Sequence, residues 1–168
     1  PIYSALSCLE SVCIPVVENF LTHGIPLSIR TSPTYDRRGN EIPSTQRSLL
    51  HSAAHYGNLH AMKFLIDLML KNKLKAMLDS PEDLTGYTPL HTAVVRKQPE
   101  IVKILLTSGA NPAATDMDRK TPLMLAIYNE HIECAIEFLK QGLWLTEDEI
   151  NLLYSKHENE RDRLSRQI

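Results

Sequence analysis

The sequence is poor in the features that mark most catalytic, membrane-bound or nucleic-acid-binding proteins. Aromatic residues make up only 6% of the 168 residues, and there is one tryptophan. The formal net charge is −2, which argues against a general nucleic-acid binder, because such proteins usually carry a strongly basic face. No apolar run approaches the roughly 20 residues that span a bilayer, and no signal peptide opens the chain. We therefore expect a monomer inside the cell, in the cytoplasm or nucleus, that binds neither membrane nor nucleic acid.

Cysteine is also scarce. Cys8, Cys13 and Cys134 are odd in number and lack the spacing of metal ligands, which favours reduced thiols over a disulfide framework. The chain lacks a G-x-S-x-G nucleophile motif, a phosphate-binding glycine loop and a paired-carboxylate pattern. These absences predict a protein without catalytic activity, metal or cofactor.

What the sequence does contain is an internal repeat. Thr88-Pro89-Leu90 recurs 33 residues later as Thr121-Pro122-Leu123. The same offset relates Asp83 to Asp116, Ala93 to Ala126, Glu100 to Glu133, Leu106 to Leu139, and Gly109 to Gly142. Self-similarity at this period is typical of proteins built from stacked repeats.

Each repeat carries the signals of two short helices. Thr88 and Thr121 can cap a helix by accepting a bond from a backbone N–H, and the proline after each suits the first helical position. Apolar residues follow at helical spacing, namely Leu90, Ala93 and Val94, then Ile101, Val102, Leu105 and Leu106, and in the next repeat Leu123, Ala126 and Ile127. We expect Gly109 and Gly142 to end the second helices in the left-handed conformation. Because one hairpin cannot bury its own apolar stripe, stacking must stabilise it.

On these residues, and on the Thr-Pro-Leu-His head at 88–91, the sequence resembles the ankyrin-repeat family. The resemblance implies an all-α fold, a solenoid of about four stacked helix-turn-helix units with finger loops and a C-terminal capping helix. We place the repeats of a single domain, 1–168, at about 2–24, 48–79, 83–115 and 116–145, with an insertion loop at 25–47 and the capping helix at 146–165.

The repeats depart from the pattern in several places. The insertion at 25–47 is either a binding loop or an inert insertion. The second helix of the second repeat is expected to run on to residue 79, a gain of about two turns. Arg119 replaces the finger glycine and Met124 replaces the histidine of the head motif. Trp144 is expected to pack beneath the capping helix or, alternatively, to anchor a partner.

The resemblance implies a non-catalytic scaffold that binds a partner polypeptide on a concave face, which the finger tips and first helices line. The candidate positions are those that the repeat core leaves free: Ser52, His55, Tyr56, Tyr87, Thr92, Val95, Arg96, Met117, Asp118, Lys120, Leu125, Tyr128 and Asn129. Tyrosine and arginine are favoured at the hot spots of protein interfaces.

Other hypotheses stay open. Pro1 and the charged C-terminal end favour a substrate-recruiting or regulatory module cut from a larger protein, such as a host-directed effector or a ligase component. A lengthened helix of the kind expected here is also similar to those of the inhibitors of Rel-type transcription factors. His51 and His55 have a spacing that can hold zinc, although the head motif already assigns His51 a bond to the neighbouring loop.

Overall fold

The computed structural model describes residues 34–35, 41–42, 48–82, 84–147 and 150–151. The repeat expected at 2–24, most of the insertion at 25–47 and most of the capping helix at 146–165 lie outside the described residues. Two strand pieces within the insertion, β1 (Thr34–Tyr35) and β2 (Glu41–Ile42), pair antiparallel, with Thr34 opposite Ile42 and Tyr35 opposite Glu41.

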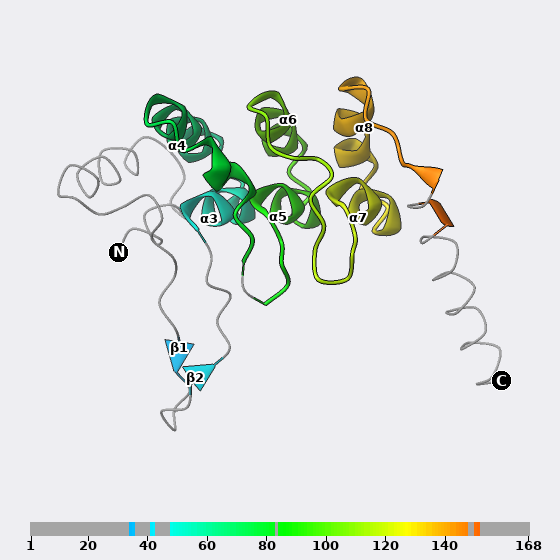
Figure 1. The fold of residues 1–168 in the computed structure, drawn as a ribbon, viewed down its shortest axis with the longest axis horizontal. Helices are drawn as coiled ribbons and strands as arrows, with labels where there is room; N and C mark the ends of the chain where they lie inside the picture. Colours follow the sequence, from blue (N-terminus) through cyan, green and yellow to red (C-terminus); the bar gives the residue numbers. More distant parts are fainter. Residues whose placement is uncertain (1–33, 36–40, 43–47, 83, 148–149, 152–168) are drawn as a thin grey trace.

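Three helical hairpins stand side by side in the described part of the chain (Figure 1). Their helices are α3 (Leu49–Tyr56) with α4 (Leu59–Lys71), α5 (Pro89–Val95) with α6 (Pro99–Thr107), and α7 (Pro122–Tyr128) with α8 (Ile132–Lys140). The first helices pack on one another in the order α3, α5, α7, and the second helices pack as α4, α6, α8. Long loops, the predicted fingers, extend from the row of first helices on the side away from the second helices (Figure 1). The predicted all-α repeat solenoid is confirmed.

Helix starts follow the capping signals in the sequence. Thr88 Oγ1 accepts the N–H of His91, Thr121 Oγ1 accepts that of Met124, and a proline occupies the first position of α5 and α7. Gly109 and Gly142, at φ +86° and +73°, follow the ends of α6 and α8 as predicted.

The apolar residues of all three hairpins form one continuous core. Leu90 and Leu123, which head the same position of successive repeats, belong to the same buried cluster, together with Leu50 of α3 and Phe138 of α8. Fully burying a side chain of this size is worth about 1.5–3 kcal/mol. Alanines at 53, 54, 93 and 126 are also buried, and their small side chains let successive first helices approach closely.

The prediction that the helix of the second repeat reaches residue 79 is wrong. The helix α4 ends at Lys71, and a 3-10 helix, η1 (Lys75–Asp79), follows. Lys73 has a left-handed backbone (φ +59°), and the Leu74 N–H donates to Met69 O at 2.8 Å, a bonding pattern that closes a helix. With 13 residues against 9 in α6, α4 gains about one turn instead of two.

A second correction concerns Ile127, which was expected on the buried face of its helix. Its side chain is 43% exposed, whereas Val94, one repeat earlier, is fully buried. The reason is positional, because α7 covers α5, while no helix of the described part of the chain covers the far side of α7.

The turn between first and second helices has a left-handed residue in each of the three repeats that the structure describes. Gly57 supplies it in the second repeat (φ +70°), but Lys97 and Glu130 supply it in the third and fourth, both at φ +57°. A Cβ makes this conformation unfavourable by about 1–2 kcal/mol. The Lys97 side chain is exposed. Burial of this side chain therefore does not offset the free-energy cost of its left-handed backbone.

Replacing Lys97 with glycine is expected to stabilise the stack. The relief of strain exceeds the entropic disadvantage of glycine, so the free energy of unfolding measured in urea should rise by ~0.5–1 kcal/mol. The reciprocal control is Gly57→Ala, in which the new Cβ would lie 2.7 Å from Gln98 Nε2 and stability should fall. Loss of stability in Lys97→Gly would contradict the strain at this turn.

Candidate functional site

Buried histidines tie the first helices α3 and α5 to the finger loop, which is the loop that precedes the first helix of the next repeat. His51 Nε2 lies 2.7 Å from Tyr87 O, and His91 Nε2 lies 3.1 Å from Lys120 O. Each Nδ1 accepts a backbone N–H at 3.2 Å, from Ser48 and Thr88 respectively, so the tautomer that satisfies both rings carries its proton on Nε2 and donates to the finger. The predicted bond from His51 to the neighbouring loop is confirmed.

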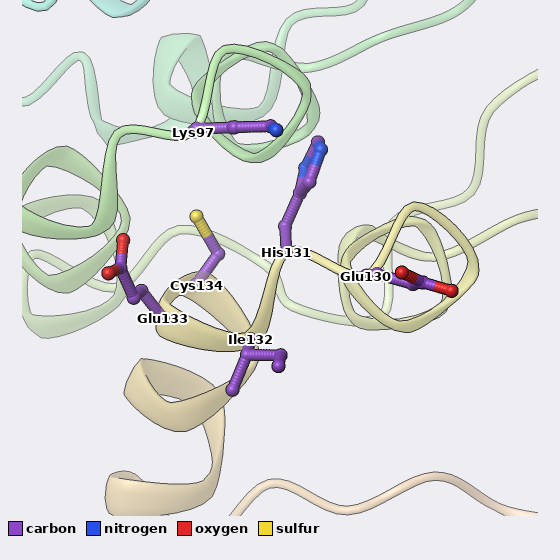
Figure 2. Close-up of a pocket in the computed structure, with 6 residues that line it drawn as sticks. All are labelled: Lys97, Glu130, His131, Ile132, Glu133 and Cys134. Carbon is purple, nitrogen blue, oxygen red and sulfur yellow. The ribbon is translucent and has the colours of Figure 1, made fainter.

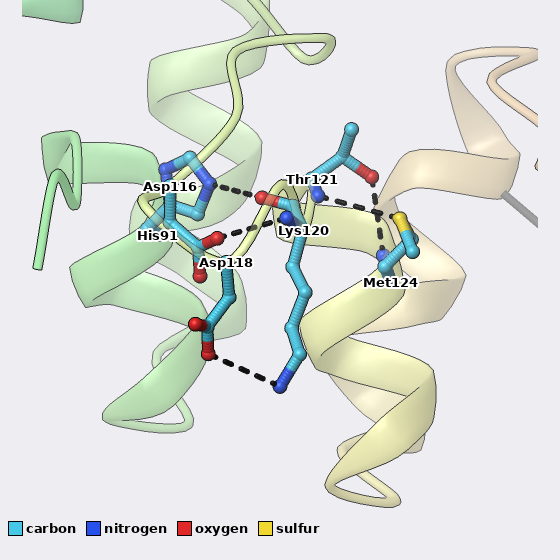
Figure 3. A network of polar contacts seen from close by, with 6 residues as sticks. All are labelled: His91, Asp116, Asp118, Lys120, Thr121 and Met124. Atoms are coloured by element: carbon cyan, nitrogen blue, oxygen red, sulfur yellow. Dashed lines mark hydrogen bonds and ion pairs between the residues drawn. The ribbon is translucent and has the colours of Figure 1, made fainter. Parts of the chain in front are cut away.

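The fingers are also held by bonds of their own, and Figure 3 shows the bond between Asp116 and Lys120 in the finger of the fourth repeat. Asp116 Oδ1 accepts the N–H of Lys120 at 2.8 Å, and the N–H of Met117 donates to Thr85 O at 3.0 Å. The second bond joins two successive fingers, so the loops of the third and fourth repeats are fixed relative to one another. Side chains on these loops therefore extend from an ordered backbone.

Figure 3 also shows where the fourth repeat departs from this arrangement. Met124 stands where the second and third repeats have histidine, and its Sδ accepts the Thr121 N–H at 3.5 Å. Sulfur is a weak acceptor and the thioether has no proton to donate. Met124 thus closes its own helix start but cannot donate a bond to a further finger.

Six of the predicted site residues lie at the C-terminal ends of the first helices, two in each repeat: His55 and Tyr56, Val95 and Arg96, and Tyr128 and Asn129. Arg96 Nε donates to His55 Nδ1 at 3.1 Å, across the junction of two repeats. The His55 ring in turn meets the Tyr56 ring edge-on, with 4.9 Å between centroids. These contacts order exposed side chains before any partner arrives.

Four more predicted residues lie on the fingers. Tyr87 stacks on the His91 ring at 5.6 Å, and Met117 is 66% exposed. Lys120 Nζ lies 3.9 Å from Asp118 Oδ2 and 4.6 Å from the centroid of the Tyr128 ring. Because Lys120 belongs to a finger and Tyr128 to a helix end, this contact places the two sets of residues on one surface.

We call this surface the finger face. It comprises His55, Tyr56, Tyr87, Val95, Arg96, Met117, Asp118, Lys120, Tyr128 and Asn129. Leu84 belongs with them, because it is 46% exposed and precedes Met117 by one repeat. Sequence reasoning missed Leu84, although the 33-residue register would have found it from Met117.

Three predicted site residues do not reach this surface. Ser52, Thr92 and Leu125 are 5%, 5% and 3% exposed. They occupy equivalent positions in α3, α5 and α7, and the side-by-side packing of these helices covers them. A partner would find almost no area on them, so we leave them out of the finger face.

Burial and nearby carboxylates together shift the pKa of Tyr87, a finger residue. Its pKa is raised by partial burial and, further, by the carboxylates of Asp116, Asp118 and Glu82. Tyr87 is therefore a neutral hydrogen-bonding group at physiological pH.

Figure 2 shows a pocket of about 250 Å³ away from the fingers, where the turn before α6 meets the start of α8. Cys134 lies in its wall, yet its side chain is 1% exposed and burial raises its pKa to about 11. Since the thiolate is the nucleophile of cysteine chemistry, this thiol is unreactive at neutral pH. The sequence-based interpretation of Cys134 as core filler is confirmed.

The zinc hypothesis is not supported at His51. Both ring nitrogens are committed to hydrogen bonds, so no lone pair is left for a metal. Across the described ranges, no group of three histidine, cysteine or acidic residues is placed to hold a metal ion. Nor does any described helix have the length and apolar character needed to cross a membrane.

A family model described as ankyrin repeats (3 copies) matches residues 13–116. This is more than half of the chain, so the chain belongs to the ankyrin-repeat family. Ankyrin repeats are a protein-interaction module and are generally non-catalytic.

Individual relatives agree with this assignment. The chain is 36% identical to human B-cell lymphoma 3 protein over 85 residues, which is 51% of this chain and 18% of that protein. It is 30% identical over 153 residues to the phosphate system positive regulatory protein PHO81 of Saccharomyces cerevisiae, covering 82% of this chain and 13% of that protein. The chain therefore spans less than a fifth of these curated relatives.

Among the solved structures that match the chain, one example is similar in both sequence and shape. The ankyrin repeat domain of Bcl-3, described as a unique member of the IkappaB protein family, matches with a TM-score of 0.53 and 33% identity, over 58% of this chain and 41% of that chain. The likeness supports the three-hairpin stack described above.

The histidine bond to the finger predicts a pH dependence of stability. Burial lowers the pKa of His91, although the bond to Lys120 O and the charge of Asp116 oppose the shift. Below the unfolded pKa of about 6.5, the unfolded chain binds a proton more readily than the folded one. The contribution of His91 to stability is therefore full above that pH and is lost as the pH falls toward the lower folded value.

We expect the free energy of unfolding to decrease between about pH 7.5 and about pH 5, and His91→Met to make this decrease less steep. Methionine is the residue that the fourth repeat carries at this position. The variant should also be less stable at neutral pH by about 1–3 kcal/mol, because Lys120 O loses its donor. Equal slopes in the wild type and in His91→Met would contradict the role of His91.

Proposed function

We propose that the finger face binds a partner protein and that this chain acts as a non-catalytic interaction scaffold. The observation that carries the proposal is the ordering of its side chains by contacts with one another. Arg96 is bonded to His55 across one repeat junction, and Lys120 lies over Tyr128 within the next repeat. A surface that is ordered in advance loses little conformational entropy on binding.

The composition of the face also favours protein recognition. Tyrosine and arginine are enriched at interface hot spots, and Tyr56 at 53% exposure and Arg96 both extend into solvent. At the finger tips Leu84 and Met117 supply exposed apolar area. A surface that combines aromatic rings, the Arg96 cation and an apolar edge suits a polypeptide with both apolar and polar side chains.

A second candidate is that the chain is the regulatory or recruiting module of a larger protein. It is favoured by the small share of each relative that the chain spans, 18% of B-cell lymphoma 3 protein and 13% of PHO81. The same finger face would then bring a substrate or regulator to other parts of the protein. The likeness to Bcl-3, of the IkappaB family, supports the narrower alternative of an inhibitor similar to those of Rel-type transcription factors.

The test compares two triple variants that differ only in the face they alter. Tyr56→Ala, Arg96→Ala and Met117→Ala change the finger face. His60→Ala, Lys103→Ala and Leu70→Ala remove an aromatic ring, a cation and an apolar side chain from exposed positions on the second helices. Binding partners are captured from an extract of the producing cells, identified by mass spectrometry, and titrated against each purified protein by calorimetry.

We expect the finger-face variant to bind its partner at least tenfold more weakly, a loss of about 1.4 kcal/mol or more. The second-helix variant should bind like the wild type, and both variants should keep a melting temperature close to that of the wild type. If only the second-helix variant bound more weakly, the interface would lie on the second helices instead, and the proposal would be refuted.

A further inference from the structure

A cationic turn joins the helix α4 to the 3-10 helix η1. Lys71, Lys73 and Lys75 are all exposed. The N–H of Lys73 donates to Leu70 O at 3.2 Å, so the chain folds back on the end of α4 and brings the three lysines into one tight turn. We call this segment, residues 70–75, the basic turn, and it contains no acidic residue.

The basic turn also exposes apolar side chains. Leu70 is 47% exposed and Leu74 is 38% exposed. In the third repeat the helix α6 closes with the same kind of bond, from the Ala110 N–H to Leu105 O at 3.0 Å. Ala110 corresponds to Leu74 in this bonding pattern, yet it is only 4% exposed. The closure of a second helix therefore does not require an exposed leucine.

Contacts with the third repeat hold the basic turn in place. In η1, which packs on α5, Leu78 is fully buried. Asp79 Oδ1 accepts the Asn111 N–H at 2.7 Å. Lys75 Nζ lies so near the end of α6 that a Cβ added at Gly109 would be 2.6 Å from it. The lysines and leucines are thus displayed from an ordered backbone.

The positive charge of the basic turn is not neutralised within the described part of the chain. There, no carboxylate forms an ion pair with Lys71, Lys73 or Lys75, whereas Lys120 and Lys140 each have an acidic partner. A cation in the last turn of a helix interacts favourably with the helix dipole, which accounts for Lys71. The dipole does not account for two further lysines beyond the end of the helix.

The backbone at Lys73 would favour a different residue. Its φ is +59°, and at the left-handed positions that follow α6 and α8 the chain has Gly109 and Gly142. A Cβ makes this conformation unfavourable. The fold therefore gives no reason for a lysine at this position.

From these observations we propose that the basic turn binds the surface of a membrane that contains anionic lipids. The lysine ammonium groups lie at the level of the lipid phosphates, and the two leucines reach the apolar boundary just below them. Such a surface offers negative charge and an apolar layer together. A nucleic acid or a polyacidic segment would complement the lysines but leave Leu70 and Leu74 in water.

Contact of this kind is peripheral and needs no spanning helix. It departs from the sequence-based expectation that the chain binds no membrane, which rested on the lack of a spanning apolar run. The basic turn and the finger face share no residue, so failure of either proposal leaves the other intact.

Co-sedimentation of the full chain with lipid vesicles at low ionic strength tests the proposal. We expect binding to phosphatidylcholine vesicles that contain phosphatidylserine and none to vesicles of phosphatidylcholine alone. Added salt should weaken the binding, because it screens exposed charges. Lys73→Gly should bind the anionic vesicles about fivefold more weakly, which is the contribution of one lysine near such a surface.

The matched control is Lys97→Gly, which removes the same charge from another left-handed position. Lys97 follows α5 and precedes α6, so it lies at the start of a second helix, whereas Lys73 follows the end of one. Lys97→Gly should bind vesicles like the wild type. Both variants should be at least as stable as the wild type, because glycine adopts this backbone readily, so weaker binding by Lys73→Gly cannot be a result of unfolding.

Leu70→Ser with Leu74→Ser tests the apolar part of the contact. This variant should bind the anionic vesicles about tenfold more weakly, because less apolar area leaves water. The proposal is overturned if the wild type does not bind anionic vesicles, binds neutral vesicles equally well, or loses as much binding in Lys97→Gly as in Lys73→Gly. It is also overturned if the leucine variant binds like the wild type, which would identify a general attraction to polyanions.

Discussion

Burial of apolar surface between adjacent helical hairpins is the interaction on which this structure depends. A helix such as α5 has only seven residues, and isolated helices of that length are not stable in water. It persists because Leu90, Ala93 and Val94 are fully buried between neighbours that are equally short. Each hairpin therefore stabilises the next, and the core runs through the stack instead of lying within any one repeat.

Polar contacts then determine how the repeats are aligned. His51 and His91 each join the start of one first helix to the finger of the following repeat. Buried hydrogen bonds of this kind contribute modestly when formed but are costly to leave unmade, so they select one register among the packings that the apolar residues would allow. That fixed register is what places Arg96 beside His55 and Lys120 over Tyr128. The order of the finger face is thus a consequence of contacts in the core.

The sequence predicted this architecture well where a local signal and the repeat agreed. Thr88, Pro89 and Gly109 each have one favourable position at a helix end, and the structure places them there. The sequence predicted helix ends and side-chain burial less well where contacts with adjacent elements determine them. Nothing local to Lys73 indicates a left-handed residue, so the end of α4 was missed, and Ser52, Thr92 and Leu125 are buried because adjacent first helices cover them. In a stacked protein, the exposure of a side chain depends on the neighbouring repeat. The residue pattern within one repeat therefore does not predict it.

The departures of the fourth repeat become consistent when they are considered together. Methionine at 124 cannot donate a bond to a further finger, and Ile136 and Trp144 replace the polar Lys103 and Asn111 of the previous repeat. A fifth repeat of the same kind would need the imidazole that Met124 lacks. The fourth repeat therefore differs from the third both in the donor that would hold a following finger and in the polarity of two exposed positions.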